Sequence, residues 1–192
     1  SSALWGTVIG ALLGGWPSDK YGRKPTLIVI GILYAMSAIG SALAWDPFSF
    51  MIFRLIGGLG VGASSVAAPA YIAEIAPAAQ RGRLVALFQT NIVIGILVAF
   101  VSNYWLGGIS ADDWRFMLGV VALPSVVYLF AALTIPESPR WLLTRRGDET
   151  RARAILSVTD PAGAEATLAA IKAGEGDETR LSLREFFAPK YS

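Results

Sequence analysis

The sequence predicts an all-α protein, a polytopic transmembrane helical bundle, and three observations support this fold class. Hydrophobic residues make up 54% of the 192 residues and charged residues only 16%, compared with about 25% charge in soluble domains. The mean hydropathy is +0.55. Apolar runs near the roughly 20 residues that cross a bilayer recur along residues 1–135.

We expect five membrane-spanning helices in residues 1–135, at about 3–17, 26–45, 48–72, 84–106 and 116–135. The first helix is shorter than a bilayer requires. Because the chain begins with Ser1 rather than methionine, we expect this helix to be cut at its start. Glycines four residues apart in the first and third spans predict close helix packing. They are Gly6, Gly10, Gly14, Gly58 and Gly62.

Loops between the predicted spans alternate in charge. One set is basic and contains Lys20, Arg23, Lys24, Arg81, Arg83, Arg140, Arg145 and Arg146. The other set contains Asp46, Asp112 and Asp113, with Arg115 as its single base. The positive-inside rule therefore predicts that the basic loops are cytoplasmic.

Residues 136–192 differ in character from the spans, because they hold nine basic and nine acidic residues. We expect a cytosolic segment of short amphipathic helices here, at about 151–156, 162–173 and 183–187. Helix-breaking residues at 160–161 and 174–176 are expected to separate them.

Composition excludes several classes of function. A net charge of +2 provides no basic field for nucleic acid, so no nucleic-acid partner is expected. The chain has no cysteine and no histidine, which removes thiol and imidazole chemistry and thiolate metal sites. No phosphate-binding Gly-x-x-x-x-Gly-Lys-Ser/Thr run occurs. We therefore expect no enzyme activity, no metal and no cofactor.

Three motifs occur in order along the chain. The first is GGWPSDKYGRK at residues 14–24, and the third is PESPRWL at residues 136–142. The second is RLIGGLGVG at 54–62, continued by PAYIAEIAP at 69–77 and RGR at 81–83. At these spacings the motifs resemble the signatures of the sugar porter family of the major facilitator superfamily. The resemblance covers nearly the whole chain.

This resemblance implies that the spans are helices two to six of twelve, so helix one and the C-terminal half are expected to be missing. Residues 136–192 would then link the two halves. The implied function is transport of a monosaccharide or polyol across a membrane by alternating access. The driving force is either the sugar gradient or a proton gradient, and the expected location is the plasma (inner) membrane. The alternatives are a transporter-like sugar sensor and a carrier for another small metabolite.

The resemblance also implies a cytoplasmic gate network that joins the two halves when the cavity faces outward. Its six residues (the gate residues) are Asp19, Arg23, Glu74, Arg81, Glu137 and Arg140. We expect Glu74 to pair with Arg81 or Arg23, and Glu137 to pair with Arg140 or with an arginine of another loop. The alternative is that these charges only satisfy the orientation rule.

Arg54 lies inside an apolar span, about 9 Å from its outer end if Phe48 begins the helix. An intramembrane arginine is costly unless it is paired or hydrated, which indicates a functional role. In proton-coupled members of the family the matching arginine faces an acidic residue on helix one. The alternative is that Arg54 extends its side chain to the outer surface.

Gln89 carries an amide that donates and accepts hydrogen bonds, which suits a hydroxyl-rich ligand. The family uses a glutamine at this position to bind sugar. Ile92, Val93 and Ile96 follow at helical spacing and share its face, so they are candidates for the apolar wall of the sugar site. An interhelical hydrogen bond from Gln89, and plain packing of the three aliphatic residues, are the alternatives.

Overall fold

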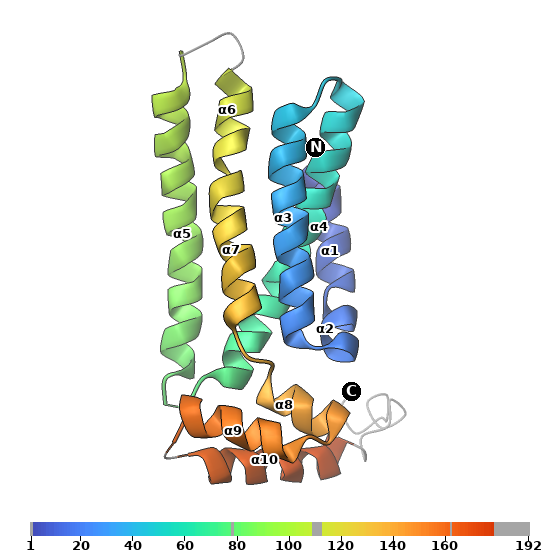
Figure 1. Cartoon of the computed structure of the whole chain (residues 1–192), viewed down its shortest axis with the longest axis vertical. Coiled ribbons are helices and arrows are strands. Elements are labelled where there is room, and N and C mark those ends of the chain that lie inside the picture. Colours follow the sequence, from blue (N-terminus) through green and yellow to red (C-terminus); the bar gives the residue numbers. More distant parts are fainter. Residues whose placement is uncertain (1, 78, 109–112, 162, 179–192) are drawn as a thin grey trace, which may run out of the picture.

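A computed structural model describes residues 2–77, 79–108, 113–161 and 163–178 of the chain. Within these ranges every regular element is helical and no strand occurs. The all-α class predicted from the sequence is therefore confirmed. Figure 1 shows long, upright helices side by side, with short helices lying across one end.

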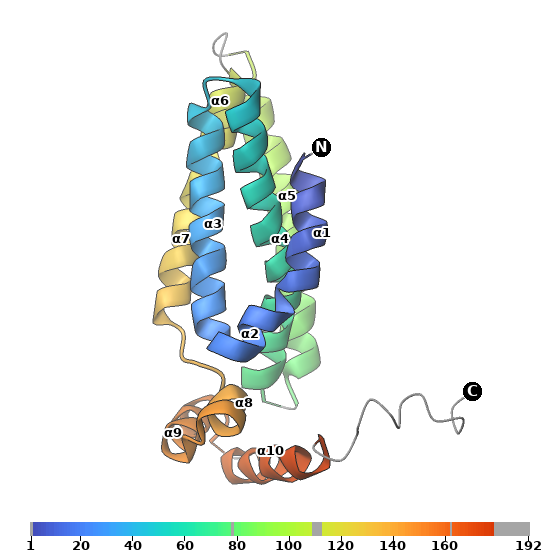
Figure 2. The ribbon, with the colours of Figure 1, turned by 90° about the vertical axis from the view of Figure 1, so that its right-hand side faces the viewer.

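The helices follow one another along the chain with short connections. They are α1 (Ser2–Leu13), α2 (Gly15–Tyr21), α3 (Arg23–Leu43), α4 (Pro47–Ile75), α5 (Arg81–Leu106), α6 (Asp113–Val120), α7 (Ala122–Thr134), α8 (Pro139–Trp141), the π-helical turn η1 (Leu142–Arg146), α9 (Glu149–Thr159) and α10 (Ala164–Glu178). Figure 2 shows that α8, α9 and α10 lie beyond one end of the upright helices. We call this end, which carries the basic loops, the basic end.

Four helical segments are long and apolar enough to cross a membrane: α3, α4, α5 and the pair α6–α7 over Asp113–Thr134. The fifth apolar helix, α1, has only 12 residues. The expected first span at 3–17 is two helices, because the chain bends at Gly14 between α1 and α2. α4 is longer than expected and continues through Pro69 to Ile75.

Glycines make the contact between α1 and α4. A Cβ atom on Gly6 would overlap the Leu55 carbonyl, and one on Gly58 would overlap the Ala3 carbonyl. A Cβ atom on Gly62 would likewise overlap the Thr7 carbonyl. The two glycine rows of the sequence are thus the two sides of one helix contact, as close packing between membrane helices requires.

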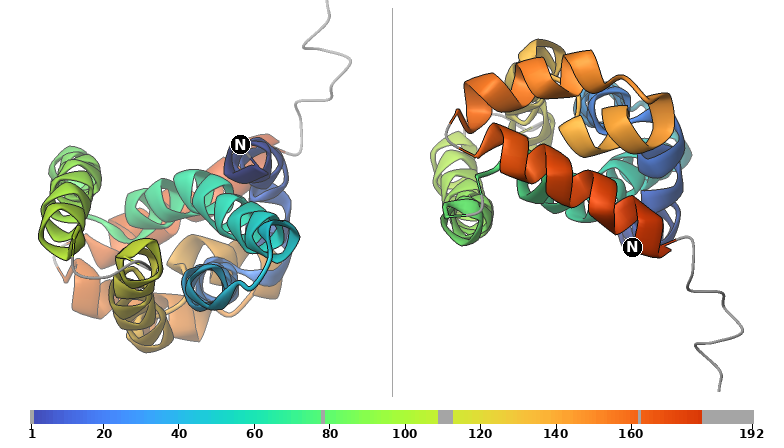
Figure 3. Two further views of the ribbon diagram at one scale, coloured as in Figure 1. Left: turned by 90° about the horizontal axis from the view of Figure 1, so that it is seen from above. Right: turned by 90° about the horizontal axis from the view of Figure 1, so that it is seen from below.

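α5 stands apart from the rest of the bundle. It contacts α4 and α6, but none of its residues is buried. Seen from above, α5 lies on the side away from α1 (Figure 3). Most of its hydrophobic side chains are therefore not covered by other helices in this structure.

The helices at the basic end have a hydrophobic core of their own. It contains Trp141, Leu142, Leu143, Ala152, Leu156, Ala164 and Leu168. α9 begins at Glu149, where the Asp148 side chain accepts a hydrogen bond from the Arg151 N–H. The break expected at residues 174–176 is wrong, because α10 continues to Glu178. Glycine costs an exposed helix only about 1 kcal/mol relative to alanine, which weakens a helix without ending it. The helix expected at 183–187 lies outside the described residues.

Candidate functional site

Gate residues from distant parts of the sequence meet at the basic end, around the first turn of α3. This helix begins directly after Gly22, whose φ of 114° lies in a region that side chains rarely adopt. A Cβ atom on Gly22 would also overlap the Glu137 carboxylate. Glycine therefore lets the chain turn sharply from α2 into α3 while Glu137 sits against the backbone.

Arg23 binds Glu74 at the end of α4 through two parallel contacts. Its Nε lies 3.0 Å from Glu74 Oε2, and its Nη2 lies 2.8 Å from Oε1. The Arg23 side chain is 13% exposed and the Glu74 side chain 11% exposed. A two-point guanidinium–carboxylate pair with little solvent is geometrically specific and resists screening by salt.

The third nitrogen of Arg23 faces α2. Its Nη1 donates to Asp19 Oδ1 at 2.6 Å and to the Ser18 carbonyl at 2.8 Å. The Asp19 side chain is 60% exposed, so water weakens this second ion pair. Arg23 thus connects the ends of α2 and α4 to the start of α3.

Ser138 extends the contact to the short helices. Its Oγ donates to Glu74 Oε2 at 2.6 Å, and the residue is fully buried. The same Oγ accepts from the Trp141 N–H at 3.3 Å, which caps the start of α8. Glu74 Oε2 therefore accepts from both the Arg23 guanidinium and the Ser138 hydroxyl. We call Asp19, Arg23, Glu74, Glu137 and Ser138 the Arg23 junction.

Glu137 binds backbone N–H groups, and it forms none of the expected ion pairs with an arginine side chain within the described residues. Its Oε1 accepts from the N–H groups of Arg23 at 2.9 Å and Lys24 at 3.1 Å. It also accepts from the Ser138 N–H at 2.8 Å. A carboxylate is favourable here because the first N–H groups of a helix lack partners within the helix and carry partial positive charge. Sequence reasoning missed this cap, since Glu137 lies 114 residues from Arg23.

Two aromatic residues that sequence reasoning did not select also join the bundle to the segment after it. Trp141 Nε1 donates to the Asp19 carbonyl at 3.0 Å. Tyr71 donates its hydroxyl to the Pro136 carbonyl at 2.9 Å. The only available signal was the presence of both residues inside the motifs at 69–77 and 136–142.

The remaining gate residues lie at the same end but outside the junction. Of the two partners expected for Glu74, Arg23 forms the pair. Arg81, the first residue of α5, is exposed and forms no ion pair within the described part of the chain. Arg140 is exposed on α8.

Arg54 is half-buried on α4, and its Cζ lies 5.3 Å from the centroid of the Phe50 ring. This distance fits a cation–π contact. No carboxylate among the described residues pairs with Arg54. Its proposed role in proton coupling stays a prediction.

The four residues expected to bind sugar lie on α5. Gln89, Ile92, Val93 and Ile96 are all exposed. The Gln89 amide has no hydrogen-bond partner within the described residues. The structure does not bring these residues to the Arg23 junction, and the sugar site also stays a prediction. The same described residues contain no cluster of three or more metal-ligating side chains.

Comparison with known sequences identifies relatives for almost the whole chain. A family model described as "Sugar (and other) transporter" matches residues 1–190. The glucose transport protein of Synechocystis is 43% identical over 169 residues, covering 81% of this chain and 36% of the relative. The D-xylose-proton symporter of Escherichia coli K12 is 37% identical over 180 residues, with coverage of 81% and 36%. The chain thus spans just over a third of these relatives.

Solved structures show the same fold. The proton:xylose symporter XylE, of the major facilitator superfamily, bound to 6-bromo-6-deoxy-D-glucose, matches with a TM-score of 0.88 and 34% identity over 95% of this chain and 44% of that one. Inward-open XylE from E. coli matches with a TM-score of 0.82 and 34% identity, covering 95% and 46%. The helices and the family match together indicate a multi-pass integral membrane protein. This chain belongs to the sugar transporter family of the major facilitator superfamily.

Proposed function

We propose that this chain supplies helices two to six of a transporter that carries a monosaccharide or polyol across the plasma membrane by alternating access. The family match over residues 1–190 is the observation that carries the proposal. Relatives named as glucose, D-xylose-proton and myo-inositol transporters support this substrate class. Helix one and the C-terminal half would complete the transporter. The cargo would cross the membrane chemically unchanged.

In this proposal the basic end faces the cytoplasm and the Arg23 junction belongs to the gate. Charge–charge contacts between helix ends stabilise one state of the transporter, and rocking of one half against the other disrupts them. The pair between Arg23 and Glu74 joins α3 to α4 within one half. Arg81 and Arg140 are exposed at the same end, which suits contacts with the other half.

Gln89 would bind hydroxyl groups of the sugar, and Ile92, Val93 and Ile96 would line the ring beside it. All four project from a helix without buried residues, as expected of a surface completed by other helices. Loss of one neutral hydrogen bond costs about 0.5–1.5 kcal/mol, so Gln89→Ala should weaken sugar affinity about 2- to 13-fold.

The experiment uses a full-length transporter containing this chain, reconstituted in liposomes. Counterflow uptake of labelled D-glucose, D-xylose and myo-inositol is measured for wild type, Gln89→Ala and Asn91→Ala. Asn91 is the matched control, because two residues along a helix place its amide on the opposite side of α5. Sugar binding without uptake would indicate a sensor, and uptake restricted to another metabolite would change the cargo. Equal affinity in wild type and Gln89→Ala would remove Gln89 from the site.

We also propose that Arg54 takes part in proton coupling. Its half-buried position and its lack of a carboxylate partner among the described residues support this role, because such a cation favours a partner on a helix outside this chain. Arg54→Gln should retain sugar exchange but lose accumulation driven by a pH gradient. Wild-type uptake that ignores the gradient would instead favour facilitated diffusion.

A further inference from the structure

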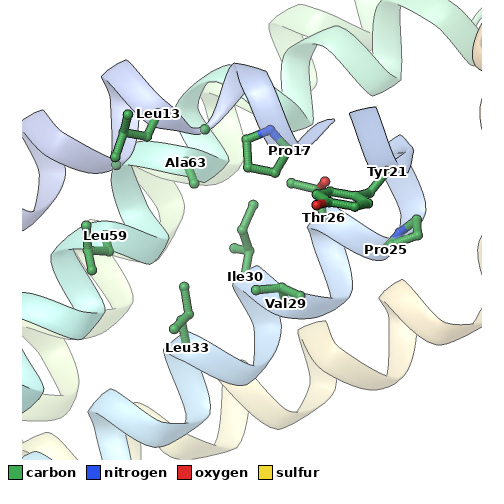
Figure 4. A pocket seen from close by; sticks show the side chains of 12 residues that line it. Leu13, Pro17, Tyr21, Pro25, Thr26, Val29, Ile30, Leu33, Leu59 and Ala63 are labelled. Carbon is green, nitrogen blue, oxygen red and sulfur yellow. The ribbon is translucent and has the colours of Figure 1, made fainter. Parts of the chain in front are cut away.

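An open apolar groove lies between α1–α2 and α3 near the basic end, and α4 also lines it (Figure 4). Its volume is about 410 Å³, within the range of roughly 300–1,000 Å³ found for ligand sites. Leu13 of α1 and Tyr21 of α2 line one side, Val29 and Leu33 of α3 line the other, and Leu59 of α4 also lines the groove.

The lining presents carbon atoms almost everywhere. Tyr21 and Thr26 are the only lining residues with polar side-chain atoms. The Thr26 hydroxyl already donates to the Gly22 carbonyl at 2.8 Å. A sugar would find too few hydrogen-bond partners here, whereas a hydrocarbon chain would fill the space and recover van der Waals contacts.

One cation lies beside the groove at its basic end, and a second is next to a lining residue in the sequence. The Lys20 ammonium is 4.7 Å from the Trp16 ring centroid and 5.4 Å from that of Tyr21, which lines the groove. Lys24 directly precedes Pro25, another lining residue. Neither lysine forms an ion pair within the described part of the chain. The nearby Asp19 carboxylate is bound by Arg23 at 2.6 Å, and the Glu137 carboxylate accepts from backbone N–H groups, so neither forms an ion pair with these lysines.

We propose that this groove binds an anionic phospholipid of the cytoplasmic leaflet, with an acyl chain in the groove and the headgroup phosphate beside Lys20 and Lys24. The occupant must be apolar along its length and anionic at one end, which favours a phospholipid over another transmembrane helix. Basic pockets between helices on the cytoplasmic side bind anionic headgroups by the same chemistry.

A lipid in this position would bridge two elements of the Arg23 junction. α2 carries Asp19 and α3 begins at Arg23, and the groove is lined by residues of both helices. The bound lipid would therefore hold α2 against α3. Lipid binding here rests on the proposed function only in that the basic end faces the cytoplasm. It does not depend on which cargo the transporter carries.

The test uses the full-length transporter in detergent, incubated with phosphatidylglycerol that carries a photoactivatable diazirine on its acyl chain. After illumination, labelled peptides are mapped by mass spectrometry, with the matching phosphatidylcholine as comparison. The charge variant is Lys20→Gln with Lys24→Gln, and its control is Arg83→Gln at the start of α5. The groove variant is Val29→Trp, and its control is Val127→Trp on α7. These two valines are 54% and 60% exposed.

We expect phosphatidylglycerol to label peptides from α1 and α3 in wild type, with labelling at least 5-fold lower in the charge and groove variants and unchanged in both controls. Equal labelling by the two lipids, or even labelling of all exposed helices, would overturn the proposal in favour of general bilayer contact. Labelling of other helices with none in α1 and α3 would show that the groove holds no lipid, which would also overturn the proposal. Neither result would bear on the proposed transport function, which sugar uptake in liposomes tests separately.

Discussion

At the scale of single residues, the geometry of Arg23 decides which substitutions the Arg23 junction tolerates. A guanidinium offers two parallel donors to Glu74 and a third nitrogen to Asp19. A lysine at this position would keep the charge but would contact Glu74 at only one point. Geometry and charge can therefore be separated by experiment.

Arg23→Lys should lower the thermal unfolding midpoint of the full-length protein in detergent, and Arg23→Ala should lower it further. Removing one partner of a poorly hydrated ion pair costs about 3–5 kcal/mol, whereas the lysine variant retains part of the attraction. Arg81→Lys is the control, because Arg81 is exposed. Equal midpoints for wild type and Arg23→Lys would show that the two-point geometry is unimportant.

Ser138→Ala should also destabilise the protein, although it removes only one oxygen. Its hydroxyl donates to Glu74 at 2.6 Å in a fully buried position, and hydrogen bonds to charged groups contribute about 1.5–3 kcal/mol. Scanning fluorimetry of this variant is compared with Ser157→Ala, whose exposed hydroxyl bonds to a carbonyl in its own helix. The same small change in both variants would argue against a role for Ser138 in holding Glu74.

At the scale of helices, two glycines illustrate opposite roles. Gly22 has a positive φ and touches Glu137, whereas Gly174 lies within α10 with no atom within 4 Å of an added Cβ. Alanine at 22 would strain the backbone by about 1–3 kcal/mol and displace the carboxylate. Alanine at 174 would favour the helix by about 1 kcal/mol.

We therefore expect Gly22→Ala to lower the unfolding midpoint and Gly174→Ala to leave it unchanged or raise it. Hydrogen exchange should localise the first effect to the start of α3 and the second to α10. A stabilised Gly22→Ala variant would contradict the turn geometry described for α2 and α3.

The pair α9–α10 is joined by charges on its surface. Glu149 contacts Lys172 at 2.7 Å and Arg153 at 3.2 Å. The hydrogen bond from Lys172, with the charge of that ammonium and of Arg153, holds the pKa of Glu149 below its ordinary value. A lowered folded-state pKa means that this contribution to stability is present above the unfolded value of about 4.3 and disappears as the pH falls through the folded value.

Hydrogen exchange in α9 and α10, corrected for intrinsic rates, should accelerate as the pH falls below about 4.3. In Glu149→Gln the exchange should already be faster at neutral pH, and its remaining acid response should be smaller. An identical acid response in wild type and Glu149→Gln would assign the effect to other carboxylates.

At the scale of the whole molecule, the positive-inside rule makes a prediction about both ends of the bundle. The chain contains no cysteine, so single-cysteine variants have no background within it. Trp105→Cys, where the tryptophan is 75% exposed, should react with an impermeant maleimide added outside intact cells. Arg146→Cys should react only after the membrane is opened. Labelling of both from the same side would refute the proposed topology.

The parts of the fold that depend on composition and helical spacing were predictable. Apolar runs predicted the long apolar helices, and rows of small residues predicted close helix packing, which the structure forms between α1 and α4. Contacts between distant segments were harder, because Ser138 and Trp141 acquire their partners only when α8 meets α2 and α4. The break expected near Gly174 failed because a weak helix former does not outweigh its neighbours. The sugar site proposed on α5 stays a prediction, because its four residues are exposed and contact no ligand-binding partner among the described residues.

The cap that Glu137 provides for α3 has a consequence for biosynthesis. The first amides of α3 receive their carboxylate from a residue 114 positions later, which a ribosome working at about 5–20 residues per second adds only after roughly 6–23 s. Until then the first N–H groups of α3 lack the Glu137 carboxylate as their hydrogen-bond acceptor. Nascent chains arrested before residue 137 should therefore leave this helix start accessible to water, and chains long enough for Glu137 to emerge from the ribosome should protect it.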